Sequence, residues 1–210
     1  MNSTSHDFKR PVLVIVAAVV IVGALVAGFF AWSSFSTDGP SDEQAVDKRL
    51  DDVPSEEEVK KMDVKKEDGD FMVESVGLSM PLSSLSVVNN TINPPRLDRA
   101  YFVRDYAKPG DKEHMSVIAL HSIKGRDIPG NRLFDIDSGE PTVGDGDEVK
   151  VQGHTYVVSK VLTEDKVDAS NNDDVWRDEP GKLLIFTCLQ RHEGRSVENI
   201  IIQAKLKDAE

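Results

Sequence analysis

The sequence predicts an all-β domain, a barrel or a sandwich, that follows a single membrane-spanning helix. The C-terminal two thirds of the chain alternate short runs rich in Val and Ile with turns that contain Gly, Pro and Asp, which is typical of all-β folds. Near the N-terminus, 22 consecutive residues carry no charge. The chain contains neither an apparent internal repeat nor a nucleotide-binding fingerprint.

The uncharged segment is residues 11–32, PVLVIVAAVVIVGALVAGFFAW. As a helix it extends about 33 Å, which is enough for a hydrocarbon core of roughly 30 Å. It is longer than the apolar part of a cleavable signal peptide, about 7–15 residues, and no small-residue cleavage site follows. We therefore expect a transmembrane helix at 11–32.

The flanking charges predict the orientation of this helix. Lys9 and Arg10 precede it directly, whereas the next basic residue is Lys48. Because basic flanks stay in the cytoplasm, we expect residues 1–10 to be cytoplasmic and the rest of the chain to lie outside the cell membrane. Trp32 suits the outer interface.

Residues 33–70 are expected to form an acidic extracytoplasmic stalk. Residues 37–70 alone contain 13 acidic and 6 basic residues, and the whole chain has a net charge of −12. Within the stalk, Ser55 and Glu58 have the spacing of a capping box, which predicts a short helix over 55–66. A chain without a basic face is a poor partner for nucleic acid, so that class is excluded.

Residues 71–210 form the predicted β domain. Gly153-His154 interrupts the longest apolar run and predicts a hairpin turn. The apolar runs are MVESVGLSMPL (72–82), AYFVRDY (100–106), MSVIALH (115–121), DEVKVQGHTYVVSKVL (147–162), KLLIFTC (182–188) and NIIIQAKL (199–206).

Cys188 is the only cysteine, so the domain has no internal disulfide. It ends the run LLIFTC, and a polar segment with Arg191 and Arg195 follows. A nearby arginine favours the thiolate, which is the nucleophilic form of cysteine. The alternative is a buried, inert thiol.

His121 also ends an apolar run, directly before a polar loop. Two strands that finish on a Cys and a His suggest a nucleophile and its proton-transfer partner. The alternative is that His121 only hydrogen-bonds a loop. We expect His114, His154 and His192 at the surface, because each lies among charged or turn residues.

Taken together, these segments resemble the sortases, the membrane-anchored cysteine transpeptidases of Gram-positive bacteria. The resemblance covers residues 71–210, and Asn93-Pro94-Pro95-Arg96 is similar to the actinobacterial branch called class F. The other segments that carry it are Leu120-His121-Ser122, Ile128-Pro129-Gly130-Asn131-Arg132-Leu133, Gly144-Asp145-Gly146-Asp147-Glu148-Val149-Lys150-Val151 and Leu184-Ile185-Phe186-Thr187-Cys188.

The resemblance implies a closed eight-stranded β-barrel with short helices, and an enzyme. We expect no cofactor and no resident metal. It implies that Cys188 attacks an LPXTG-like sorting signal between Thr and Gly. The thioacyl-enzyme then passes its acyl group to an amine on a cell-wall precursor, to a pilin or to water. His121 is the implied general acid/base, and an arginine stabilises the oxyanion.

The sequence departs from the family pattern at two places. The family's TLXTC reads Leu184-Ile185-Phe186-Thr187-Cys188 here. Many sortases place the arginine directly before the last apolar strand, where this chain has Asn199. Arg195 is the favoured candidate for the arginine, and Arg191 is the alternative.

Two further alternatives remain open. Asp and Asn side chains crowd residues 165–174 and could bind calcium, although a solvated loop is favoured because the spacing is not that of an EF-hand. Trp176 is expected to pack over the barrel.

The rival to the enzyme is a catalytically inactive exported binding module with a buried Cys188.

Overall fold

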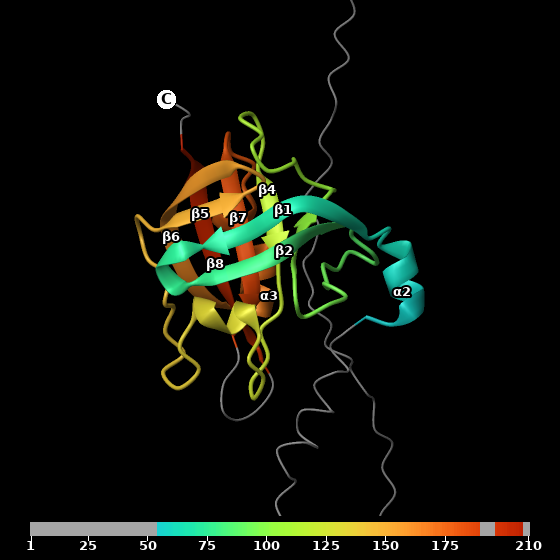
Figure 1. Cartoon of the computed structure of the whole chain (residues 1–210), viewed down its shortest axis with the longest axis horizontal. Coiled ribbons are helices and arrows are strands. Elements are labelled where there is room, and N and C mark those ends of the chain that lie inside the picture. Colours follow the sequence, from blue (N-terminus) through green and yellow to red (C-terminus); the bar gives the residue numbers. More distant parts are fainter. Residues whose placement is uncertain (1–53, 190–195, 208–210) are drawn as a thin grey trace, which may run out of the picture.

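The computed structural model describes residues 54–189 and 196–207, which form a closed barrel of eight strands (Figure 1). The strands follow the order β1-β2-β3-β4-β7-β8-β6-β5, and pairing of β5 with β1 closes the ring. The predicted closed eight-stranded barrel with short helices is confirmed. The strands are β1 (Lys65–Val73), β2 (Leu78–Leu85), β3 (Ala100–Val103), β4 (Ser116–Ala119), β5 (Glu148–Val151), β6 (His154–Asp165), β7 (Lys182–Cys188) and β8 (Glu198–Leu206).

The six apolar runs give eight strands because two of the runs fold back on themselves. The run 72–82 contains the end of β1 and the start of β2, and Gly77 takes the left-handed conformation between them, with φ +62°. The run 147–162 contains β5 and β6. Its turn has positive φ at Gln152 and Gly153, so it falls one residue earlier than predicted.

The N-terminal edge of the barrel starts inside the segment that we assigned to the stalk. The predicted capping box forms between Ser55 and Glu58, and it starts the short helix α2 (Glu56–Lys61). Met62 follows this helix and is buried. β1 then begins at Lys65, six residues ahead of residue 71, but its first part is solvent-exposed and therefore has the polar composition of a stalk.

No helix within residues 54–189 and 196–207 is long and apolar enough to cross a membrane. The predicted transmembrane segment, residues 11–32, lies outside the described residues.

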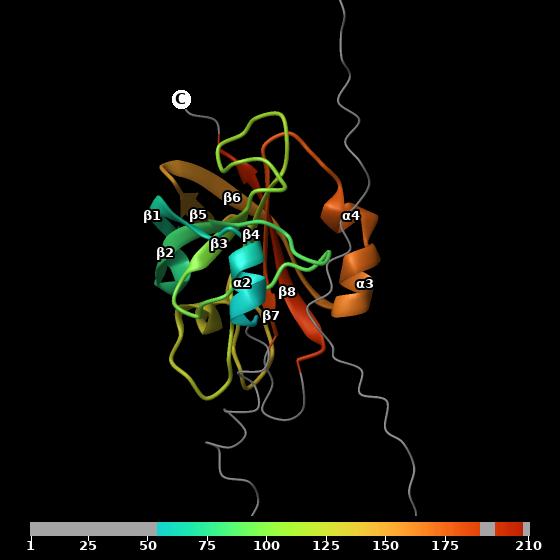
Figure 2. The same ribbon diagram turned by 90° about the vertical axis from the view of Figure 1, so that its right-hand side faces the viewer.

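Four neighbouring strands, β3, β4, β7 and β8, are buried on both faces. In β7, Leu183 and Ile185 belong to the cluster that fills the barrel, whereas Leu184 and Phe186 belong to a second cluster on the outer face. This double burial explains why the β7 sequence is a continuous apolar run without alternation. The short helices α3 (Lys166–Asn171) and α4 (Asp173–Trp176) lie along this outer face (Figure 2).

A buried lysine holds α4 in place. Lys182 begins β7 and is only 1% exposed. Its Nζ donates to the carbonyl oxygens of Asp174, Val175 and Arg177 at 3.0, 2.8 and 3.2 Å. Burial lowers the pKa of this ammonium group, while the carbonyls at the helix end satisfy its three N–H donors.

Replacing Lys182 by Met should therefore destabilise the domain. The variant keeps the length of the side chain but leaves three carbonyl oxygens without their donor, which we expect to lower the free energy of unfolding by about 3 kcal/mol. Lys205→Met is the matched control, because Lys205 pairs with Lys182 across the strands but is half-exposed and only salt-bridges Glu179. Chemical denaturation should show a change of about 1 kcal/mol or less for this control. Equal losses in both variants would contradict the account.

Candidate active site

The structure places Cys188 and His121 at the same end of two adjoining strands. Cys188 is the last residue of β7, and His121 follows β4 by two residues. β4 and β7 are parallel and paired from Ser116 with Leu183 to Ala119 with Phe186. This register, continued by two residues, places His121 level with Cys188.

Hydrogen bonds beyond the paired residues show that the strand ends stay together. The Leu120 N–H donates to the Phe186 carbonyl oxygen at 3.3 Å. The Ser122 hydroxyl donates to the carbonyl oxygen of Cys188 itself. The segment that carries His121 therefore remains attached to β7 up to the cysteine.

The alternation of side chains indicates which face the two residues share. Val117 and Ala119 of β4 lie in the outer cluster, as do Leu184 and Phe186 of β7. Because side chains alternate along a strand, Cys188 follows the direction of Phe186. We infer that His121, two residues after Ala119, shares this outer face. Cys188 is partly exposed and His121 is 7% exposed.

The His121 ring is fixed by a loop that arrives from another part of the sequence. Nε2 of His121 hydrogen-bonds the carbonyl oxygen of Pro94, which lies between β2 and β3. A carbonyl oxygen can only accept, so Nε2 must carry a proton, and in the neutral ring Nδ1 is the basic nitrogen.

The loop that provides this carbonyl is itself anchored. Ile92 is fully buried in the outer cluster. Arg96 forms a two-pronged ion pair with Asp98, with distances of 2.9 and 2.7 Å. Hydrogen bonding from Arg96 holds the pKa of Asp98 well below its usual range. The motif Asn93-Pro94-Pro95-Arg96 therefore has a structural role, because its Pro94 carbonyl oxygen orients the His121 ring.

The predicted arginines cannot be placed. Arg195 and Arg191 both lie outside the described residues, so the choice between them stays a prediction. Asn199 faces Cys188 directly across the β7–β8 pair. Sequence reasoning noted Asn199 only as the residue standing where an arginine was expected, and missed the role of the Pro94 carbonyl.

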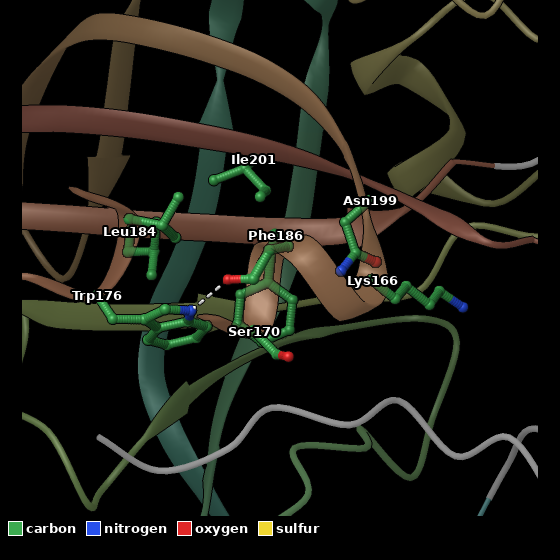
Figure 3. Close-up of a pocket in the computed structure, with 9 residues that line it drawn as sticks. Lys166, Ser170, Trp176, Leu184, Phe186, Asn199 and Ile201 are labelled. Atoms are coloured by element: carbon green, nitrogen blue, oxygen red, sulfur yellow. Dashed lines mark hydrogen bonds between the residues drawn. The ribbon is translucent and has the colours of Figure 1, made fainter. Parts of the chain in front are cut away.

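A narrow cavity of about 10 Å³ lies on the outer face of β7 and β8, under α3 and α4 (Figure 3). Trp176 packs over the barrel as predicted, with its ring centre 6.2 Å from that of Phe186 and its Nε1–H bonded to the Ala169 carbonyl oxygen at 2.7 Å. The lining residues are Lys166, Ala169, Ser170, Val175, Trp176, Leu184, Phe186, Asn199 and Ile201.

The Asp- and Asn-rich stretch 165–174 forms helix caps rather than a loop. Asp165 accepts from the Val167 N–H and caps α3, whereas Asn172 accepts from the Asp174 N–H and caps α4. Within the described part of the chain, no group of three or more His, Cys, Asp or Glu residues has the geometry of a metal site.

The remaining histidines differ in their surroundings. His154 is exposed, as predicted. His114 is about half-exposed and its Nδ1 pairs with Asp178 at 2.9 Å, which links the segment before β4 to the loop after α4. His192 lies outside the described residues.

Comparison with known proteins gives the fold but no relative by sequence. No protein-family model matches the chain, and neither does any curated protein. Among solved structures, sortase C-1 of Streptococcus pneumoniae superposes with a TM-score of 0.51 at 14% identity, over 82% of this chain and 93% of that chain. The sortase D5 transpeptidase of Clostridium perfringens gives 0.48 at 21% identity, over 79% and 95% of the two chains.

The superposition on the Streptococcus protein, together with the eight-stranded closed barrel, shows that this chain has the sortase fold. The closer assignment to a class F-like branch stays a prediction.

The His114–Asp178 pair should make stability depend on pH. The hydrogen bond that His114 donates to the Asp178 carboxylate raises the pKa of His114 above its ordinary value. The stabilisation is therefore fully present below the pKa of the unfolded state and is lost as the pH rises through the folded-state pKa. His114→Asn removes the stabilisation by this pair. The difference in melting temperature between wild type and variant should therefore shrink as the pH rises from about 5.5 to about 8.5.

Asp178→Asn is the companion variant, because it removes the charge but keeps an oxygen for the Met115 N–H, which Asp178 binds at 2.7 Å. Like His114→Asn, it should weaken the dependence of the melting temperature on pH. A gap that stays constant over this range would show that the pair does not contribute.

Proposed function

We propose that this chain is a sortase-type cysteine transpeptidase, with Cys188 as nucleophile and His121 as general acid/base. The observation that carries the proposal is the parallel register of β4 and β7, which brings the ends of both strands together on one face. The sortase fold supports the same class of enzyme. Neither residue is explained by the packing of the barrel interior, since both follow the outer face.

In the proposed reaction, the Cys188 thiolate adds to the Thr carbonyl carbon of an LPXTG-like sorting signal. The tetrahedral intermediate collapses, the bond to Gly breaks, and protonated His121 gives its proton to the leaving amine. An acceptor amine then attacks the thioester, gives a proton back to His121, and releases Cys188 as thiolate. With Nε2 held by Pro94, Nδ1 is the atom that exchanges this proton.

Arg195, or alternatively Arg191, is proposed to stabilise the oxyanion of the two tetrahedral intermediates, because a fixed cation beside developing negative charge lowers the barrier. The proposed enzyme uses no cofactor and no metal.

We propose that the enzyme is anchored in the cell membrane through residues 11–32, with a cytoplasmic N-terminus and its catalytic domain outside. Its proposed substrates are proteins with LPXTG-like sorting signals. Its proposed acceptors are amines of a cell-wall precursor or a pilin. This arrangement fits an acidic segment between the anchor and the barrel, which keeps the domain solvated near the membrane.

The test uses the full chain in detergent with quenched Leu-Pro-Xaa-Thr-Gly peptides, with and without an amine acceptor, and identifies products by mass spectrometry. Wild type should cleave between Thr and Gly and form amine adducts. Cys188→Ala should abolish cleavage, and His121→Ala should lower it by about 10²–10⁴-fold. His154→Ala is the matched control and should cleave like wild type, because His154 is exposed and starts β6, whereas Asn199, which faces Cys188, pairs with Glu164 at the other end of β6.

The rival binding module makes the opposite prediction. Its Cys188 would react with iodoacetamide only after unfolding, and no peptide would be cleaved. That combination of results would refute the proposed enzyme.

A further inference from the structure

A buried side-chain amide stands directly opposite Cys188. In the antiparallel β7–β8 pair, Cys188 is matched with Asn199. Directly opposed residues of such a pair have Cβ atoms about 4.5–5.5 Å apart and point to the same face of the sheet. Asn199 is therefore adjacent to the proposed nucleophile, although it is 11 residues away along the chain.

Asn199 faces the cavity rather than the barrel interior. It lines the cavity with Phe186 and Ile201, whereas its neighbour Ile200 belongs to the interior cluster. Figure 3 shows Asn199 at the end of the cavity near Lys166, with Trp176 and Leu184 toward the other end.

Within the described residues, the Oδ1 atom of Asn199 is not used by the fold. The residue is 4% exposed, yet its Oδ1 has no hydrogen-bond partner among the described residues. Nearly all buried polar side-chain atoms in native proteins are hydrogen-bonded, and leaving one unpaired costs about 1–3 kcal/mol. The nearest carboxylate along β6, Glu164, is instead engaged by Asn172 at 2.9 Å.

A carboxamide offers one acceptor and two donors on a short planar group. An extended peptide presents the N–H and the C=O of the same residue along one edge, so one carboxamide can bind both. Because Cys188 is partly exposed, a peptide that reaches its thiol on this face comes next to Asn199, which stands directly opposite.

We propose that Asn199 is a catalytic residue that holds the scissile threonine of the sorting signal by its backbone. Oδ1 accepts the Thr N–H, and Nδ2–H donates to the Thr carbonyl oxygen. When the Cys188 Sγ–C bond forms, the carbonyl π pair moves to this oxygen, and Nδ2–H stabilises the resulting oxyanion without giving up its proton. The proposal rests on the proposed transpeptidase function.

Two substitutions in the full chain distinguish the contribution of the acceptor, Oδ1, from that of the donor, Nδ2–H. Asn199→Asp keeps the shape and an acceptor for the Thr N–H, but it loses the donor and places a negative charge beside the developing oxyanion. We therefore expect kcat to fall about 10²-fold, a larger change than the rise in KM. Asn199→Ala loses both, so kcat should fall and KM should rise. Gln203→Ala is the matched control. Gln203 lies on the same strand and, within the described residues, also has a buried amide atom without a partner, but it stands opposite Leu184 rather than Cys188. Its kcat and KM should match wild type.

The decisive experiment compares a Leu-Pro-Xaa-Thr-Gly peptide with its depsipeptide, in which an ester oxygen replaces the Thr N–H. Wild type should lose roughly tenfold in kcat/KM on the ester, as expected for one hydrogen bond. Asn199→Ala should be indifferent to the change, because the partner atom is already gone. An equal loss in both proteins would overturn the role of Asn199 while leaving the enzyme intact. Failure of wild type to cleave either peptide would instead overturn the proposed function, and this inference with it.

Discussion

The parallel pairing of β4 with β7 is the constraint on which the candidate site depends. Parallel strands finish at the same edge of a sheet, so the strand pairing alone brings side chains at the two strand ends close together. The pairing keeps Ser116 to Ala119 in step with Leu183 to Phe186. A slip of one residue would turn Cys188 to the other face of the sheet, away from His121.

The register is stabilised because both faces of these strands are buried. The interior cluster fixes one set of side chains, and the outer cluster, covered by α3 and α4, fixes the alternate set. A slipped strand would therefore have to repack two cores rather than one. Lys182, which ties α4 to the start of β7, thus supports the strand that ends in Cys188.

Much of the fold was predictable from local chemistry, because turns and apolar runs act over a few residues. The charged start of β1, residues 65–70, was not predicted, since an exposed strand edge carries no apolar signal. Residues 165–174 read as a loop because Asp and Asn favour turns, yet the same side chains cap α3 and α4. Of the site, Cys188 and His121 could be found as polar residues at strand ends. The Pro94 carbonyl and Asn199 could not, because their positions depend on strand register and loop packing between distant segments.

The adjacency of residues 121 and 188 can be measured directly, because the chain contains a single cysteine. His121→Cys provides a second thiol, and mild oxidation of the folded protein followed by peptide mapping reports whether the two thiols join. Disulfides need Cα atoms about 4.4–6.8 Å apart, a range that level residues of paired strands satisfy. The account predicts an internal disulfide between positions 121 and 188, and none for Ala119→Cys, which is level with Phe186. Two thiols that remain free in the folded His121→Cys protein, or that join only between molecules, would contradict it.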